Sequence, residues 1–269
     1  EQKHRISLYN LGICYEYGRG TDIDLEKAFE AYSASTKLNY PSAYYQLGML
    51  YKHGKFVEQD KVKAFELFLK GAENGHSDAQ WQAGYAYENG LGVEKDLVKA
   101  FEWYKTSAEQ KHRISLYNLG ICYEYGHGTD IDLEKAFESY LVAAELGYTK
   151  AKFKAAYFYD AGKCTETNVE KAYEWYTQAV NEGHTTAHYN LGLYYKKGKG
   201  GEVDHQKAFD LFAKAADNGH VLSIYQVGCY FETGLNGEIN LEKAIDFYKK
   251  AADMGNKSAQ AALKRIEES

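Results

Sequence analysis

The sequence contains one proline and 25 glycines in 269 residues. Proline has no backbone N–H and interrupts helices, whereas glycine readily takes the left-handed conformation in which many helices end. A chain with this composition can form long helical stretches that end where glycines stand.

Long apolar segments are missing as well. No run approaches the roughly 18 residues of a membrane-spanning helix, and no signal peptide is recognisable at the start of the chain. We therefore expect no insertion into a membrane. The chain opens with Glu1-Gln2-Lys3 and lacks an initial methionine, so we expect it to be a piece of a longer protein.

Positive charge is not concentrated in any part of the sequence. The 32 lysines and arginines are outnumbered by 38 acidic residues, which gives a net charge of −6 and an isoelectric point near 5.9. Proteins that bind nucleic acid usually present a basic patch to the phosphates, so the sequence predicts no nucleic-acid partner. Aromatic residues, in contrast, make up 15% of the chain and supply ample material for a core.

A period of 36 residues runs through the chain without insertions. Gly12 returns as Gly48, Gly84, Gly120, Ala156, Gly192 and Gly228, and Lys27-Ala28 returns in every unit. We number positions by the first repeat, so that position 9 is residue 9, 45, 81 and so on. The predicted repeats are 5–40, 41–76, 77–112, 113–148, 149–184, 185–220 and 221–256.

Each repeat is predicted to contain two helices, A and B. In the first repeat, helix A runs from about residue 7 to the glycine at position 18, and helix B starts after the capping residue Asp24 and continues to about Leu38. A mid-helix glycine such as Gly12 costs about 1 kcal/mol relative to alanine, so we expect another helix to approach it closely. A single pair cannot bury its apolar face, and stacked pairs can. The sequence predicts an all-α solenoid that forms one domain over residues 1–269.

The two ends of the chain depart from the repeat. In the segment 257–269, Lys264 and Glu267 stand where a repeat would have its core glycine and tyrosine, which predicts a capping helix with a charged outer face. Residues 1–4 match 109–112, where a helix B closes. Residues 1–32 and 109–140 differ at only two positions, which indicates either a recent duplication or a functional pair of identical half-sites.

The repeat resembles a known family in its sequence motif. The motif reads Leu119-Gly120-x-x-Tyr123-x-x-Gly126-x-Gly128-x-x-x-Asp132-x-x-Lys135-Ala136-Phe137. It is similar to the Sel-1-like repeat (SLR), a relative of the tetratricopeptide repeat with a longer unit. The resemblance implies a right-handed superhelix that acts as an adaptor or scaffold. Members serve in cell-wall synthesis control, endoplasmic-reticulum quality control and bacterial host interaction, or are fused to kinases, and the resemblance does not choose among these.

The four cysteines are predicted to be reduced. Cys14 and Cys122 occupy the same position three repeats apart, and no repeat carries two cysteines, so a pair within about 7 Å is not expected. Reduced cysteines favour an intracellular, cytoplasmic protein. A secreted or endoplasmic-reticulum luminal adaptor is the alternative.

The sequence predicts no metal, no cofactor and no catalytic residue. His76, His112, His184 and His220 share position 40, after the end of helix B, where a role in the turn is expected. His184 and His188 have the spacing of a zinc pair but lack a third ligand. The glycine pairs such as Gly126-x-Gly128 lack the Lys-Ser/Thr of a phosphate loop. A hydrolase is therefore only a remote alternative to a binding protein.

The candidate site is a row of aromatic residues on helix A, on the side that the helical wheel places opposite the core. We expect the row to line a concave surface and to bind a peptide or helix of a protein partner through basic or apolar anchors, with the chain acting as a monomer. The alternative is that these rings only pack between neighbouring helices. The candidates are Tyr9, Tyr45, Trp81, Tyr85, Tyr117, Phe153, Tyr157, Tyr189 and Tyr225, bordered by the acidic Glu88, Glu124 and Asp160.

Overall fold

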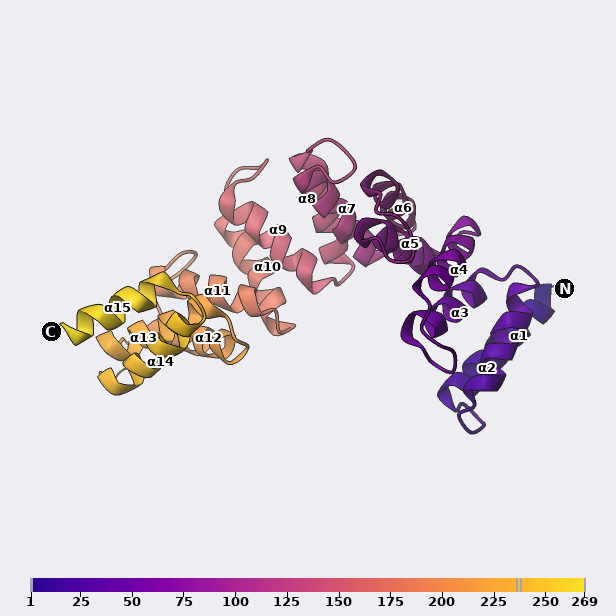
Figure 1. The fold of residues 1–269 in the computed structure, drawn as a ribbon. Helices are drawn as coiled ribbons and strands as arrows, with labels where there is room; N and C mark the ends of the chain where they lie inside the picture. Colours follow the sequence, from indigo (N-terminus) through magenta and orange to yellow (C-terminus); the bar gives the residue numbers. More distant parts are fainter. Residues whose placement is uncertain (1, 236, 238, 269) are drawn as a thin grey trace. The chain divides into compact units, whose positions relative to one another are not determined.

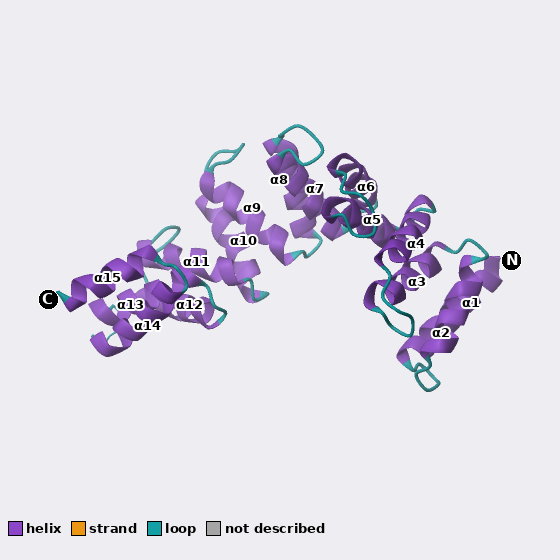
Figure 2. Cartoon of the chain, in the orientation of Figure 1, coloured by secondary structure: helices purple, strands orange, loops and turns teal. Residues whose placement is uncertain are grey.

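The computed structural model describes residues 2–235, 237 and 239–268, and within these ranges all regular secondary structure is helical (Figures 1 and 2). Seven helices occupy the A place: α1 (Gln2–Tyr17), α3 (Pro41–His53), α5 (Ser77–Asn89), α7 (Arg113–Tyr125), α9 (Thr149–Ala161), α11 (Thr185–Lys197) and α13 (Val221–Thr233). Seven occupy the B place: α2 (Leu25–Thr36), α4 (Lys61–Glu73), α6 (Leu97–Glu109), α8 (Leu133–Glu145), α10 (Val169–Asn181), α12 (His205–Asp217) and α14 (Leu241–Asp253). The last helix is α15 (Lys257–Glu267). The all-α prediction is confirmed.

The chain forms two compact units, of which the first ends at Leu146 and the second begins at Gly147. Unit 1 contains four helix pairs, α1 to α8. Unit 2 contains three pairs, α9 to α14, and α15. Within each unit a helix B packs on its own helix A and on the next helix A along the chain, as in a solenoid. A single domain over the whole chain stays a prediction.

The helix ends lie where the capping residues predict them. The side chain of Asp24 accepts a hydrogen bond from the backbone N–H of Lys27 at 3.0 Å, and the residues at this position do the same in the other six repeats. Helix α3 ends at Gly54, whose φ of 63° is left-handed. Short acceptor side chains and glycine thus set both ends of the loop between helices A and B.

The first helix is longer than its sequence repeat predicts. Residues 109–112 end helix α6 and turn the chain, with φ of 60° at Lys111 and a capping contact from His112. The matching residues at the start of the chain instead extend α1 back to Gln2. The turn at 110–112 closes through backbone hydrogen bonds to Ser107 and Ala108 of α6.

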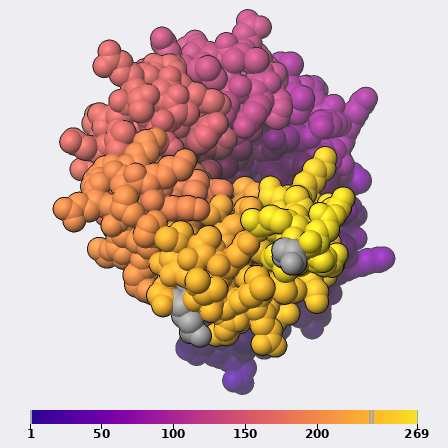
Figure 3. Space-filling model, turned by 90° about the vertical axis from the view of Figure 1, so that its left-hand side faces the viewer, coloured from indigo at the N-terminus to yellow at the C-terminus, as the bar shows by residue number. Residues whose placement is uncertain are grey.

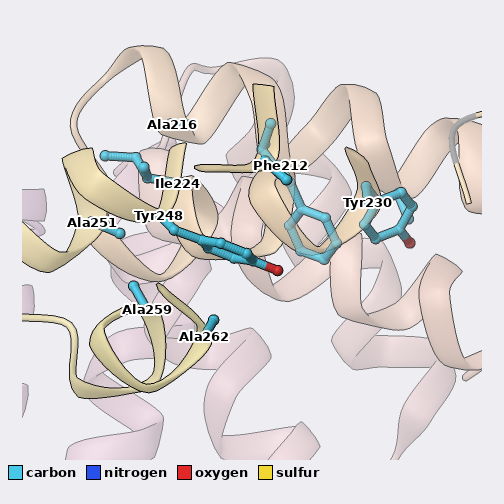
Figure 4. Packing of buried hydrophobic residues seen from close by; sticks show 11 residues of the cluster. Phe212, Ala216, Ile224, Tyr230, Tyr248, Ala251, Ala259 and Ala262 are labelled. Carbon is cyan, nitrogen blue, oxygen red and sulfur yellow. The ribbon is translucent and has the colours of Figure 1, made fainter. Parts of the chain in front are cut away.

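The glycine at position 12 makes room for helix B of its own repeat, above all for the aromatic ring at position 32, as expected. A Cβ on Gly12 would lie 2.5 Å from Cε1 of Tyr32, and one on Gly48 would lie 2.6 Å from Cε1 of Phe68. The aromatic residue at position 32 is fully buried or nearly so in every repeat. Figure 4 shows two of these rings, Phe212 and Tyr248, between the helices of unit 2.

A second set of rings joins consecutive repeats within each unit. Position 29 of one repeat meets position 15 of the next, as in the edge-on pair of Phe65 and Tyr87 with ring centres 5.1 Å apart. The lysine at position 27 lies over the position-15 ring of its own repeat, for example Lys63 over Tyr51 at 4.6 Å. All seven repeats contain this lysine–ring contact. The recurrence of Lys-Ala in the sequence has this physical reason.

Helix α15 packs on the end of unit 2 through small residues. Ala259 and Ala262 are buried beside Tyr248 in the cluster of Figure 4, whereas Lys264 and Glu267 are exposed. The yellow C-terminal segment accordingly forms part of the outer surface in the space-filling view (Figure 3). The charged outer face predicted for this helix is present.

Candidate partner-binding surface

The position-9 rings are half-buried in every repeat. Each of them except Trp81 lies within 6.0 Å of the ring at position 32 of its own repeat, as Tyr45 does with Phe68. Several also contact the residue at position 40, and Tyr45 stacks on His76 at 5.1 Å. One side of each ring is therefore held by the core while another edge reaches solvent. Both interpretations of the row, as packing and as an exposed surface, have structural support.

The histidines at position 40 are helix caps, which confirms the expected turn role. Nδ1 of His76 accepts the backbone N–H of Ala79 at 3.2 Å, and His112, His184 and His220 cap α7, α11 and α13 in the same way. A ring nitrogen that accepts a hydrogen bond carries no proton. Burial lowers the pKa of His76, His184 and His220, which keeps them neutral.

His184 and His188, which have the spacing of a zinc pair, both make other contacts. His184 uses Nδ1 to cap α11, and Nδ1 of the buried His188 lies 2.9 Å from the backbone oxygen of His184. Within the described ranges no three His, Cys, Asp or Glu side chains gather as metal ligands.

Tyr85 and Trp81 form an aromatic pair on helix α5 of unit 1. Their ring centres lie 6.1 Å apart, and Tyr85 is 37% exposed. Trp81 also packs on His112 at 6.0 Å, and its buried indole N–H has no hydrogen-bond partner. In unit 2, Tyr157 has the same exposure as Tyr85, and the ammonium of Lys163 lies 5.1 Å from its ring centre.

The acidic residues at position 16 are not a free border of the aromatic row, which corrects our expectation. Glu16 and Glu124 are buried, with 8% and 7% exposure. Each accepts a hydrogen bond of 2.7 Å from the hydroxyl of the tyrosine at position 32 of its repeat. Glu88 and Glu232 accept the same bond at 2.6 Å. Four of the five acidic side chains at position 16 therefore bind a tyrosine hydroxyl of their own helix pair.

Asp160 is held by the following repeat. Its shorter side chain accepts a hydrogen bond of 2.6 Å from the hydroxyl of Tyr194 and pairs with the ammonium of Lys199. Asn190 donates to the hydroxyl of Tyr176, the ring that would otherwise face an acid at position 16. The carboxylate is again satisfied within its unit.

Positions 16 and 32 vary together, and this signal was available in the sequence. An acid at position 16 accompanies tyrosine at position 32 in five repeats, and lysine accompanies phenylalanine in the other two, as in Lys52 with Phe68 and Lys196 with Phe212. Phenylalanine has no hydroxyl to donate, so a buried carboxylate there would lack its partner. The correlation follows directly from the hydrogen bond.

The exchange to lysine accompanies a pocket in unit 1. The pocket encloses about 350 Å³ between the end of α3, the start of α4 and α5. The ammonium of Lys52 donates to Oε1 of Gln82 at 3.0 Å and lies 5.8 Å from the ring centre of Tyr85. Burial lowers the pKa of Lys52. The walls are formed by Lys52, His53, Gln59, Lys61, Ala64, Phe65, Phe68, Gln82, Tyr85, Ala86 and Leu91. Of these residues, only Tyr85 is among the candidates predicted from the sequence.

Two further observations concern the whole chain. No helix in the described ranges has the length and apolar character needed to cross a bilayer. Cys14, Cys122, Cys164 and Cys229 form no disulfide with one another in the described structure.

Solved structures similar to this chain are helical repeat proteins. A protective antigen of uropathogenic Escherichia coli strains with an SLR fold is 29% identical, with a TM-score of 0.89 over 98% of this chain and 57% of that one. This chain thus spans little more than half of that protein. A Sel1 repeat protein from Oxalobacter formigenes is 28% identical, with a TM-score of 0.78 over 92% of this chain and 96% of that one. A search of curated proteins finds no match.

The family model of the Sel1 repeat matches the chain seven times in succession. The matched residues are 6–39, 41–76, 77–112, 114–148, 149–184, 185–220 and 221–256. Each match coincides with one pair of helices A and B in the structure. The motif, the helix pairs and the seven matches together show that the chain belongs to the Sel1 repeat family.

Proposed function

We propose that this chain is a protein-interaction scaffold whose helix A face in unit 1 binds a peptide or helix of a partner. Sel1-repeat proteins generally act as protein-interaction scaffolds and are generally not catalytic. The observation that supports the site most directly is the pair of Trp81 and Tyr85. These two rings are partly exposed and lie beside the 350 Å³ pocket or in its wall.

Rings that are already held in place suit partner binding. Trp81 and Tyr85 pack on each other, and Trp81 also packs on the cap His112. Side chains held in this way lose little conformational freedom when a partner covers them. Tryptophan and tyrosine are also the side chains that most often carry binding energy at interfaces.

The buried acids change the partner chemistry that we propose. Glu16 and Glu124 are occupied by tyrosine hydroxyls inside the fold, which leaves less negative charge for a basic anchor than the sequence predicts. We therefore favour apolar and aromatic anchors over basic ones along the row that contains Tyr9, Tyr45, Trp81 and Tyr117.

Replacement of Trp81 tests the proposal. Peptides that bind this chain are first selected from a displayed random library, and their affinities are measured by isothermal titration. Trp81→Ala should weaken the selected peptides by about 30-fold, which is the loss expected when a hot-spot aromatic worth about 2 kcal/mol is truncated. The melting curve of the variant, followed by circular dichroism, should stay close to that of the native chain.

Trp103 provides the matched control. It lies on α6, the helix B of the same repeat, where it packs on the cluster of Ala72, Ala79 and Ala83. Trp103→Ala removes an indole of the same size from the other helix and should leave peptide affinity unchanged. Unchanged affinity in Trp81→Ala, or an equal loss in both variants, would rule out the helix A face as the site.

We propose that the protein is intracellular and cytoplasmic and acts as a monomer. In this proposal the chain is the non-catalytic part of a kinase-linked or cell-wall regulatory protein. The thiol state of the four cysteines supports a reducing compartment. A secreted or luminal adaptor is the alternative, supported by the description of the E. coli relative as a protective antigen. Fractionation of cells that express the full-length protein decides between the two locations.

A further inference from the structure

The pocket beside Tyr85 is basic in a protein of net negative charge. Among the described residues that line it none is acidic, whereas Lys52, Lys61 and His53 can all carry positive charge. The net charge of the chain is −6. Within the described structure no carboxylate forms an ion pair with Lys52, whose ammonium contacts the Gln82 amide and the Tyr85 ring. A half-buried cation without an anionic partner is costly unless something pairs with it.

In five of the seven repeats, position 16, which Lys52 occupies in repeat 2, carries an acidic residue. In repeats 1, 3 and 4 the glutamate at position 16 accepts a hydrogen bond from the tyrosine at position 32 of its own repeat. Glu16 also lies 3.8 Å from the ammonium of Lys55 in the next repeat. In repeat 2, Phe68 and Lys52 have removed both the hydroxyl and the carboxylate. The second repeat therefore has a cation where its neighbours supply an anion.

We propose that this pocket binds an acidic side chain of a partner peptide, with its carboxylate at Lys52 and its flanking apolar residues against Tyr85 and the pocket wall. The inference rests on the proposed function, because the pocket opens beside the helix A face. The apolar wall formed by Phe65, Phe68 and Leu91 lies in the same pocket as the cations. An anchor that combines a carboxylate with neighbouring aromatic groups matches both parts.

The probes are three short peptides that differ in one carboxylate. Acetyl-Phe-Glu-Phe-amide carries a side-chain carboxylate, acetyl-Phe-Gln-Phe-amide is its neutral isostere, and acetyl-Phe-Gln-Phe with a free C-terminus carries only a terminal carboxylate. Binding is measured by NMR titration at low ionic strength, followed through the side-chain amide of Gln82 and the ring of Tyr85. The Glu peptide should bind about ten-fold more tightly than either Gln peptide, as expected for one charge-assisted hydrogen bond.

Substitutions in the pocket test whether binding depends on the charge of Lys52 in a protein that still folds. Lys52→Gln should reduce the affinity for the Glu peptide about ten-fold, while Lys63→Gln, which removes a lysine of the same repeat outside the pocket wall, should not. The double variant Lys52→Glu with Phe68→Tyr installs the pair found in repeat 3, Glu88 with Tyr104. It should fold, as shown by its melting curve, and should lose the binding of the Glu peptide.

The outcomes are distinguishable from those of the Trp81 experiment. Equal binding of the Glu and Gln amides, or unchanged binding by Lys52→Gln, overturns the acidic-anchor inference even if Trp81→Ala weakens library peptides. Tighter binding of the free C-terminus than of the Glu side chain overturns the assignment to an acidic side chain. If the Glu peptide binds through Lys52 while Trp81→Ala leaves library peptides unaffected, the pocket stands and the proposed aromatic surface fails.

Discussion

The residues at positions 16 and 32 are exchanged together, and the exchange changes the charge and hydrogen bonding between helices A and B. Tyrosine with glutamate gives a buried, satisfied hydrogen bond, whereas phenylalanine with lysine gives a half-buried cation beside a pocket. Neither partner can be exchanged alone without loss. A buried carboxylate needs its donor, because an unsatisfied charged group loses hydration and gains nothing in return.

The cost of breaking one pair can be measured in the first repeat. Tyr32→Phe leaves the buried Glu16 without its 2.7 Å hydroxyl donor, so we expect a loss of about 1 to 3 kcal/mol in the free energy of unfolding. Adding Glu16→Lys converts the pair into the one found at Lys52 and Phe68 and should recover part of that loss. Urea unfolding of the native chain, both single variants and the double variant gives the coupling free energy between residues 16 and 32. If the two single effects simply add, the pair has no special role.

At the scale of helices, local capping residues set the boundaries of nearly every element. The acceptors at position 24, the glycines at position 18 and the caps at position 40 each act on a few adjacent backbone groups. The sequence predicted these ends correctly for that reason. The exception is α1, which begins at Gln2, earlier than the sequence predicts.

The histidine caps predict a pH dependence of helix stability. The pKa values of His76, His184 and His220 are lowered by burial from an ordinary value of 6.5. The folded state therefore binds fewer protons than the unfolded state between that value and the lowered one. Stability from the neutral caps is complete above about pH 6.5 and is lost as the pH falls through the lowered values.

Replacing the three histidines by asparagine tests this dependence. Asn256 occupies position 40 before α15 and caps it through Oδ1 at 2.9 Å, so asparagine preserves the cap without a titrating group. Thermal unfolding at pH 7.5 and pH 5 should show a smaller acid loss in the triple variant, by about 1 kcal/mol per cap. An identical loss in both proteins would assign the acid sensitivity to other groups.

At the scale of the whole molecule, stacked pairs bury a continuous core within each unit. Rings at position 32 lie against the small residue at position 12 and join the helices of a pair, and rings at positions 15 and 29 join one pair to the next. Such a stack exposes apolar surface wherever it stops unless the last element has a polar outer face. Helix α15 supplies one, with Lys264 and Glu267 exposed.

Changing that outer face should promote association. Lys264→Gly with Glu267→Tyr restores the residues that a repeat has at these places and exposes an apolar end. Light scattering at increasing protein concentration should then show a mass above that of the monomer. A melting curve controls for loss of α15, because the introduced glycine costs about 1 kcal/mol in a helix. An unchanged mass at high concentration would show that the charged face does not prevent stacking.

The sequence by itself determined the period, the helix pairs, the caps and the family, because each depends on residues that are close together in the chain or recur at a constant spacing. It also predicted Trp81 and Tyr85 as part of a binding surface, and that surface stays a prediction. The tertiary structure decided what the sequence could not: that Glu16 and Glu124 are buried, that the position-9 rings are half held by the core, and that Lys52 faces a pocket. These facts depend on side chains 16 residues apart or in the following repeat, which meet only when the helices pack.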